Sequence, residues 1–336
     1  MKLRKILLAA VVLTALLLAA GCGKKAEQPP VAQPITAPVT NPSINIEPLI
    51  AEWLASDHSN IQLYPAGRDT CVTCHDGGAF AGKLTQQDQL HREFNVALDC
   101  RACHSGYGLE IQKSGVVNLP NQQNFKAGKG ALCLSCHNER GVPNINDARR
   151  ASPHGGSQGG IFSGSGGIRT DGFSYISSPH TGIGDTCIAC HMTKTPEGLP
   201  SHTFRVDSAE DSCSKCHSGL TDVNRKALGD YDGDGTAKGF QDEVKGLLKI
   251  LEAAIVEALE GGSFATGGGQ VQFKDAKGEL IAPADISNEI YQAGYNHVLV
   301  KYDGSYGIHN PHYVVQLLQQ SYKALTGKDV PGATLK

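Results

Sequence analysis

Apolar residues recur with a helical period only in the last third of the chain. Between residues 240 and 259 they stand at 244, 247, 248, 251, 255, 256 and 259, which is the spacing of one helix face. Gly261 and Gly262 end this predicted helix. Two further helices are predicted over 284–300 and 311–325, the second with a proline, Pro311, in its first turn. The C-terminal part, 240–326, is therefore expected to be helical.

The rest of the chain shows little periodicity. Val271 and Phe273, followed by a Lys-Gly turn at 277–278 and by Leu280-Ile281, suggest a small β-hairpin. A short helix is predicted to carry both the only tryptophan, Trp53, and His58. Residues 151–186 are mostly Gly and Ser without periodicity, a composition typical of disorder unless another partner orders the segment. The pattern indicates a mainly α protein with much irregular structure.

The first 48 residues differ from the remainder. Lys2, Arg4 and Lys5 precede an apolar run from 6 to 20, which is short for a membrane span and typical of a signal peptide. The run ends Leu-Ala-Ala-Gly-Cys22, which resembles the lipobox of bacterial lipoproteins. The resemblance implies that 1–21 are removed, that Cys22 is lipidated, and that the protein is an outer-membrane lipoprotein facing the periplasm or the exterior. The alternative is an ordinary signal peptide with a chance cysteine. Residues 22–48 contain six prolines and are predicted to be an extended tether to a folded domain at 49–336.

Composition narrows the class of protein further. The 336 residues include 40 Gly but one Trp and only 6% aromatic residues, which is little material for a large apolar core. A mean hydropathy of -0.23 excludes a multi-span membrane protein. The net charge of -3 argues against a nucleic-acid partner. Eleven cysteines, an odd number, do not suit a simple disulfide framework.

The ten cysteines after Cys22 form five identical C-x-x-C-H motifs within 71–217. This spacing is that of c-type haem attachment, in which two thiols bond to one porphyrin and the adjacent histidine binds its iron. A zinc site gives no reason for a histidine after every pair, and a thioredoxin-like site would use a single motif. We therefore expect five haem c groups. The thioether positions are Cys71, Cys74, Cys100, Cys103, Cys133, Cys136, Cys187, Cys190, Cys213 and Cys216, and the proximal iron ligands are His75, His104, His137, His191 and His217.

The second iron ligand of each haem is expected to be histidine. Only one methionine, Met192, follows the signal peptide, and it directly follows His191, so it cannot fold over the same haem. Eight further histidines suffice for five low-potential bis-His sites. His297 is expected to pack in an apolar surrounding and His312 to be solvated. The distal candidates are His58, His91, His154, His180, His202 and His309.

These motifs resemble those of the multihaem c-type cytochromes of metal-respiring bacteria. The quoted segments are Ser-Pro-His154, Ser-Pro-His180, Ser-His202-Thr-Phe-Arg and Gly-Ile-His309-Asn-Pro-His-Tyr. The segment Tyr302-Asp-Gly-Ser-Tyr-Gly-Ile-His309-Asn-Pro also resembles a region of the nitrite-reductase and octahaem cytochrome group, which implies a distal-ligand role for His309. The pentahaem nitrite reductases attach their catalytic haem through C-x-x-C-K, whereas all five motifs here end in histidine. The resemblance implies a multihaem cytochrome c fold in which haems fill the core, and residues 151–186 would then lie over porphyrins.

A possible calcium loop follows the last motif. Asp230, Asp232 and Asp234 stand at positions 1, 3 and 5 of an EF-hand-like loop with glycine at position 6. Position 12 is glutamine, so the final ligand would be Glu243, two residues later. The alternative is an acidic turn that caps the following helix.

Taken together, these features predict electron transfer through closely packed haems on an anchored lipoprotein, with no catalytic residue. The expected partners are periplasmic or outer-membrane redox proteins, and an extracellular metal oxide could be the final acceptor. One alternative is a terminal reductase of a nitrogen or sulfur oxyanion, in which one haem would lack a distal ligand. Another is a subunit of a cytochrome filament, in which a surplus histidine such as His58 or His91 would bind a haem of the next subunit.

Overall fold

The computed structural model describes residues 45–336. The predicted signal peptide, Cys22 and the tether up to residue 44 lie outside these residues. Residues 46–336 form one compact unit, and its first helix begins at Glu47, two residues before the expected start of the folded domain. Within the described residues, no helix is both long enough and apolar enough to cross a membrane.

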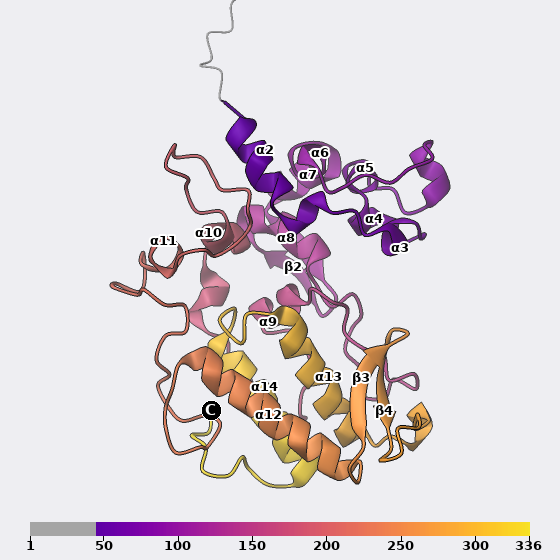
Figure 1. Ribbon diagram of the computed structural model, residues 1–336, viewed down its shortest axis with the longest axis vertical. Helices are drawn as coiled ribbons and strands as arrows, with labels where there is room; N and C mark the ends of the chain where they lie inside the picture. The colour runs from indigo at the N-terminus through magenta and orange to yellow at the C-terminus, as the bar shows by residue number, and fades with distance from the viewer. Residues whose placement is uncertain (1–44) are drawn as a thin grey trace, which may run out of the picture. The chain divides into compact units, whose positions relative to one another are not determined.

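Most elements of the first two thirds of the chain are short (Figure 1). The helices are α2 (Glu47–Leu54), α3 (Leu63–Ala66), α4 (Val72–His75), α5 (Gly77–Gly82), α6 (Cys100–His104), α7 (Gly106–Ser114), α8 (Ala131–Cys136), α9 (Gln158–Ser163), α10 (Cys187–His191) and α11 (Ala209–Cys213). Single 3₁₀ turns cover Asp57–Ser59, Gln87–Leu90, Gly128–Gly130, Pro179–Gly182 and Pro283–Asp285. Strands β1 (Val116–Leu119) and β2 (Gln122–Lys126) form an antiparallel hairpin that the sequence pattern did not predict.

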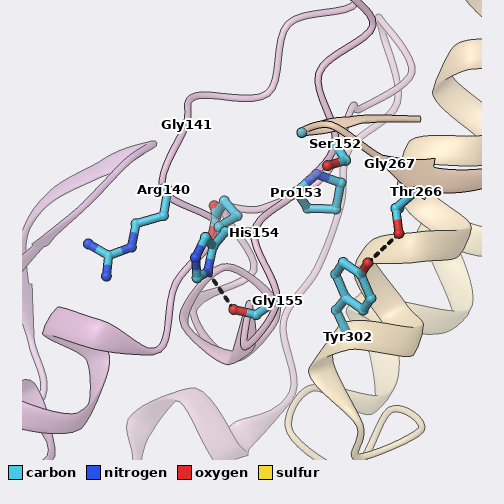
Figure 2. Close-up of a pocket in the computed structure, with 11 residues that line it drawn as sticks. Arg140, Gly141, Ser152, Pro153, His154, Gly155, Thr266, Gly267 and Tyr302 are labelled. Carbon is cyan, nitrogen blue, oxygen red and sulfur yellow. Dashed lines mark hydrogen bonds between the residues drawn. The ribbon is translucent and has the colours of Figure 1, made fainter. Parts of the chain in front are cut away.

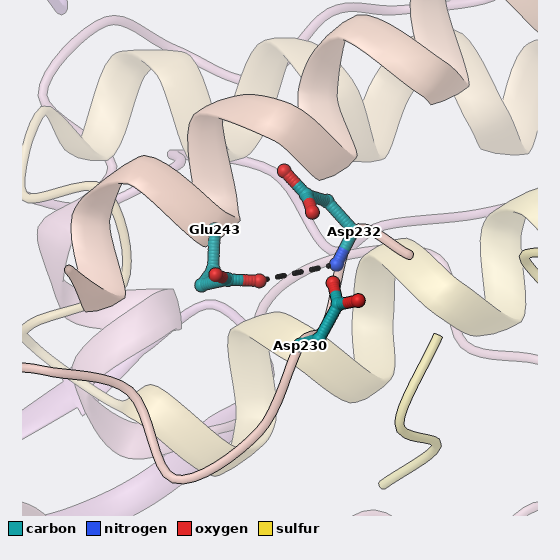
Figure 3. Close-up of side chains that lie close together, drawn as sticks. All are labelled: Asp230, Asp232 and Glu243. Carbon is teal, nitrogen blue, oxygen red and sulfur yellow. Dashed lines mark hydrogen bonds between the residues drawn. The ribbon is translucent and has the colours of Figure 1, made fainter. Parts of the chain in front are cut away.

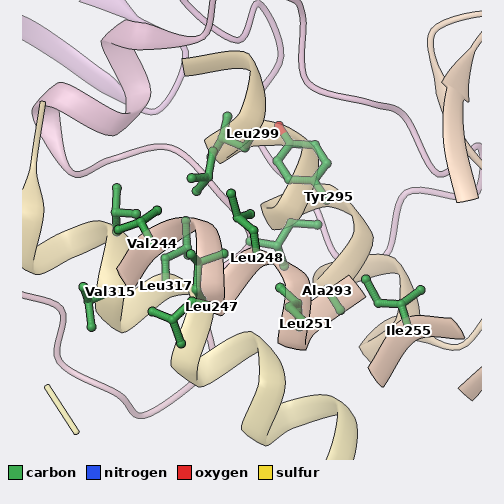
Figure 4. Packing of buried hydrophobic residues seen from close by; sticks show 14 of the residues in the cluster. Val244, Leu247, Leu248, Leu251, Ile255, Ala293, Tyr295, Leu299, Val315 and Leu317 are labelled. Atoms are coloured by element: carbon green, nitrogen blue, oxygen red, sulfur yellow. The ribbon is translucent and has the colours of Figure 1, made fainter. Parts of the chain in front are cut away.

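Three long helices form the C-terminal part: α12 (Phe240–Ala258), α13 (Asn288–Asp303) and α14 (Pro311–Thr326). They confirm the three predicted helices, although α13 begins four residues later than expected. The delay has a local cause, because Pro283 starts a 3₁₀ turn and the hydroxyl of Ser287 then caps α13 by accepting the N–H of Ile290. Their facing side chains form the main hydrophobic core, as Figure 4 shows for Leu251 on α12, Leu299 on α13 and Leu317 on α14.

The predicted hairpin is only partly right. The regular hairpin pairs β3 (Ser263–Gly267) with β4 (Gln270–Lys274), and its turn is Gly268-Gly269. The expected turn at 275–278 also exists, but it closes on a single bridge between Lys274 and Leu280. The strand β3 was missed because its sequence, Ser-Phe-Ala-Thr-Gly, lacks apolar alternation and gains its place from pairing with β4.

The Gly- and Ser-rich segment 151–186 is ordered by the side-chain amides of the C-terminal helices. The Asn296 side chain on α13 accepts the N–H of Ile168 at 2.8 Å, and the Gln316 side chain on α14 accepts that of Ile176 at 2.8 Å. Asn310, just before α14, accepts the N–H of Ser178 at 2.8 Å. These amides replace the backbone partners that a helix or sheet would supply. The segment therefore lies against α13 and α14, and it carries His154 and His180.

A second, smaller hydrophobic cluster supports the N-terminal motifs. It joins α5, α6, α7, β1 and α8, and its buried residues include Phe80, Ile111 and Leu134. Here the helices approach closely because Gly108 of α7 lies against the backbone carbonyl of Ala102 in α6. The fold is thus mainly helical with much irregular structure, and a compact helical part stands next to a region of short elements that carries the motifs.

Candidate functional site

Every motif histidine faces a second histidine from a distant part of the chain. The ring centroids of each pair are 6.1 or 6.2 Å apart. The pairs are His75 with His154, His104 with His202, His137 with His58, His191 with His309, and His217 with His180. Five of the six distal candidates thus lie opposite a motif histidine, each opposite a different one.

The separation suits a metal ion between two imidazoles. A metal-to-imidazole nitrogen bond is about 2 Å long and the nitrogen lies about 1.1 Å from the ring centre, so two trans ligands have centroids about 6.2 Å apart. Packed aromatic rings span about 4.5–7 Å, so the distance alone does not identify a metal site. The distinguishing observation is that nearly the same spacing recurs in five pairs, each of which joins one motif histidine to a different distant histidine.

Hydrogen bonds orient many of these rings. The Nδ1 atoms of His154, His180, His202 and His191 lie 2.6–3.0 Å from backbone carbonyl oxygens. That of His137 lies 3.1 Å from the Gln158 side-chain oxygen, and that of His309 lies 2.6 Å from an Asp303 oxygen. An oxygen acceptor requires the proton on Nδ1, which leaves Nε2 free to bind a metal. Six of the ten rings are therefore held in the tautomer that a metal ligand needs.

Electrostatics also favour the neutral, ligating form. Burial lowers the pKa of His58 to about 4, and the neighbouring His137 adds to the effect. Burial is likewise the main cause of the lowered pKa values of His75 and His191. His309 is the exception: burial would lower its pKa, but the adjacent Asp303 carboxylate raises it more.

Local structure brings the two thiols and the histidine of a motif together. Motifs two and four occupy α6 and α10 completely, and motif one ends α4. In a helical turn the residues at i, i+3 and i+4 share one face, which is the spacing of the two cysteines and the histidine. The third motif has both cysteines in α8. The fifth begins at the last residue of α11, and the N–H groups of Cys216 and His217 both donate to the carbonyl of Cys213, so it also makes a turn. The motifs therefore have the local geometry that places two thiols and an imidazole on one surface.

The motifs are close neighbours in space. The thiols of Cys74 in motif one and Cys136 in motif three lie close enough to shift each other's pKa, and so do those of Cys133 in motif three and Cys187 in motif four. Phe204 lies between further sites: its ring is 4.7 Å from that of His58 and 5.8 Å from that of His202. Its carbonyl oxygen is the 3.0 Å partner of His191. The two cysteine contacts place the third motif next to both motif one and motif four.

The remaining histidines do not face a motif. His91 is exposed, in a left-handed backbone conformation, and within residues 45–336 no other ring packs against it. His297 is buried against Phe264, as expected for a packing residue, and burial lowers its pKa to about 4. The Glu252 carboxylate is 3.6 Å from it, but that side chain is half-exposed, so solvent screens its charge. His312 is partly exposed at the start of α14.

A cavity of about 390 Å³ opens beside the first pair (Figure 2). His154 and Arg140 line one part of it, and Thr266 and Tyr302, which share a 2.6 Å hydrogen bond, line the other. The positive charge of Arg140 is near enough to the first motif to help lower the pKa of the Cys74 thiol. The cavity thus connects the distal side of the first pair with the surface.

The predicted calcium loop is only partly assembled. Oxygen atoms of Asp230, Asp232 and Glu243 lie within 4.8 Å of one another (Figure 3). Asp234 is not part of this group; its carboxylate pairs with Lys238, whose ammonium also lies 3.3 Å from Asp232. The Glu243 carboxylate is fully buried and accepts backbone N–H groups of the loop, including that of Tyr231 at 2.6 Å. It therefore closes the loop onto α12.

Comparison with known proteins agrees with the fold and with the motifs. The chain has a multihaem cytochrome c fold, with haem c as the implied cofactor. Residues 172–330 match the family model of cytochrome c552. The outer cell wall cytochrome OcwA is similar in structure, with a TM-score of 0.53 at 23% identity over 82% of this chain. The match covers 50% of the OcwA chain, so this protein spans about half its length. No match was found among curated proteins.

Sequence reasoning missed three residues that shape the sites: Asp303, Gln158 and Phe204. None belongs to a C-x-x-C-H motif. Gln158 and Phe204 reach His137 and His58 from distant segments, whereas Asp303 stands six residues before His309. Only the tertiary structure brings their oxygen atoms or ring to the imidazoles.

Proposed function

We propose that this protein transfers electrons through five covalently attached haem c groups, each bound by two histidines. The observation that carries the proposal is the common spacing of 6.1–6.2 Å in five pairs, each built from one motif histidine and one distant histidine. Each haem would supply reversible one-electron chemistry at its iron. The protein holds the porphyrin through thioethers and fixes the imidazoles through Nδ1 partners.

In this proposal each motif takes its distal ligand from the histidine that it faces. His154 would serve the first motif, His202 the second, His58 the third, His309 the fourth and His180 the fifth. His91 has no role in this scheme. His58 lies opposite His137 of its own chain. It is therefore not available to bind a haem of the next subunit, and of the two histidines named for the filament alternative only His91 is left.

A carrier is favoured over a terminal reductase. A reductase of a small oxyanion needs an iron with an open position, and a histidine lies opposite every motif histidine. In addition, every motif ends in histidine, whereas the pentahaem nitrite reductases use a C-x-x-C-K motif for the catalytic haem. The contacts of the third motif with the first and the fourth support short steps between sites, and the third motif would be a central member of the relay.

The cellular role extends this proposal. A lipid on Cys22 would anchor the protein to the outer membrane, on the periplasmic or the outer side, with residues 22–48 as tether. Its partners would then be other redox proteins or an extracellular metal oxide. OcwA, the similar solved structure, is described as an outer cell wall cytochrome, which supports a site of action at the cell envelope.

We also propose that Asp230, Asp232 and Glu243 bind one Ca²⁺. Calcium prefers several carboxylate and carbonyl oxygens, and three such carboxylates already converge here. Two of them are buried, and burial raises the pKa of Asp232, so a divalent cation would relieve an unfavourable concentration of charge.

The main proposal is tested on the matured holoprotein. Intact mass and a pyridine haemochrome assay should give five haems per chain, and electron paramagnetic resonance should show low-spin iron only. Optical titration should show that all five reduce at low potential. A haem count below five, or a high-spin signal from one haem in the native protein, would contradict the carrier with five bis-His sites.

A further inference from the structure

Asp303 distinguishes one of the five sites from the other four. Its Oδ1 atom lies 2.6 Å from Nδ1 of His309, and its side chain has no solvent exposure. Within residues 45–336, the other oriented rings of the five pairs have neutral partners, either a backbone carbonyl or the Gln158 amide. His309 is thus the one paired histidine with a carboxylate on Nδ1 in the described chain.

The carboxylate is held in place by its surroundings. Its second oxygen, Oδ2, accepts hydrogen bonds from the hydroxyl and the N–H group of Ser305. The Ser305 hydroxyl also accepts the N–H of His309, which closes a small ring of interactions. The Asp303 carbonyl accepts the Gln158 side-chain amide at 3.1 Å, and the same amide group contacts His137. Asp303 therefore cannot turn away from His309 without breaking several bonds.

The position is costly for an acidic residue. Asp303 is the last residue of α13, where the helix dipole is negative and a carboxylate is destabilising. Burial of a charge adds to this cost. A buried acid at the wrong end of a helix, aimed at a metal-ligating imidazole, is typical of a residue retained for function.

From this geometry we propose that Asp303 is a positioning residue that lowers the reduction potential of the haem attached to motif four below that of the other four. The inference rests on the proposed function, because it needs His309 to bind iron through Nε2. A carboxylate that accepts the Nδ1 proton makes the imidazole a more basic ligand. A more basic ligand stabilises the iron(III) state over the iron(II) state.

The redox step itself is a one-electron exchange. With haem bound at this site, its oxidation would pass one electron to a neighbouring oxidised haem, which would be reduced, and no bond to the protein would form or break. Asp303 would keep the Nδ1 proton of His309 in their hydrogen bond in both states. The third motif is in contact with the fourth, so the haem of motif three would be the acceptor. The lower potential of the haem on motif four would favour electron transfer from that haem to the haem on motif three.

The test compares Asp303→Asn with Asp329→Asn in the holoprotein. Both remove one carboxylate charge, but Asp329 lies on the surface and pairs with Lys323. In an optical redox titration, the native protein should show one fifth of the haem reducing last. Asp303→Asn should raise the equilibrium constant for reducing that fifth about tenfold, or about 59 mV for a one-electron couple. Asp329→Asn should leave it unchanged.

The proposal is overturned if Asp303→Asn leaves the last fifth unmoved or shifts all five haems equally. These results differ from failure of the proposed function, which would already appear as missing or high-spin haem in the native protein.

Discussion

Replacing His154 by alanine tests the pairing most directly. His154 faces His75 with centroids 6.1 Å apart, so its removal should open the distal side of the haem on motif one. Since the structure contains five such pairs, one fifth of the haem should become high-spin while four fifths stay low-spin. The optical and electron paramagnetic resonance spectra of the oxidised protein measure this fraction.

The cavity beside His154 allows a rescue. It has a volume of about 390 Å³ and His154 itself is exposed, so free imidazole can reach the vacated position. Added imidazole should return the high-spin fifth to the low-spin form. His91→Ala is the matched control, because His91 is exposed and faces no motif histidine, and it should leave all haem low-spin. Low-spin haem throughout in His154→Ala, or a high-spin fifth in His91→Ala, would refute the assignment.

Three further outcomes follow from other parts of the fold. Gly108→Ala should lower the unfolding free energy by about 1–3 kcal/mol, because its Cβ would lie 1.9 Å from the backbone oxygen of Ala102; Gly141→Ala, which meets nothing within 4 Å, is the control in thermal unfolding. Ca²⁺ at a hundred times its Kd should stabilise the fold by about 2.7 kcal/mol, which would appear as a higher Tm than in EGTA. Glu243→Gln should abolish this difference in Tm. Equal Tm values with Ca²⁺ and with EGTA in the native protein would contradict the calcium proposal. His297 has a pKa of about 4 in the folded state against 6.5 in the unfolded state, so the unfolded chain binds the proton more tightly and stability is lost as pH falls from about 6.5 to about 4, by up to about 3 kcal/mol. His297→Leu should flatten denaturant midpoints over that interval, and an unchanged pH profile would show that another group is responsible.

The N-terminal region illustrates why haems matter to the fold itself. Its hydrophobic cluster is small, and its helices, such as α4 and α6, are only one turn long. Isolated helices of this length are unstable in water. Covalent porphyrins between the imidazole pairs would supply the apolar area that the side chains lack, which agrees with the low aromatic content of 6%.

The sequence alone determined the features that are local along the chain. The C-x-x-C-H spacing predicts which thiols and histidines act together, because one helical turn is enough to bring them to one surface. The periodic residues of α12 and α14 predicted two long helices within a residue of their bounds, since an apolar stripe at helical spacing has few other solutions. Five of the six distal candidates chosen from the sequence lie opposite a motif histidine in the structure. The sequence did not indicate which motif each of them faces.

Only the tertiary structure decided that pairing, because the partners are separated by up to 118 residues, as His191 and His309 are (309 − 191). Side-chain amides on α13 and α14 fix the path of the Gly- and Ser-rich segment, and so set the positions of His154 and His180, although that segment has no pattern of its own. The same applies to Asp303: its sequence position at a helix end shows an unfavourable charge, and only packing reveals the imidazole that it serves. Distances through space are set by long-range contacts, which leave no periodic signal in the sequence.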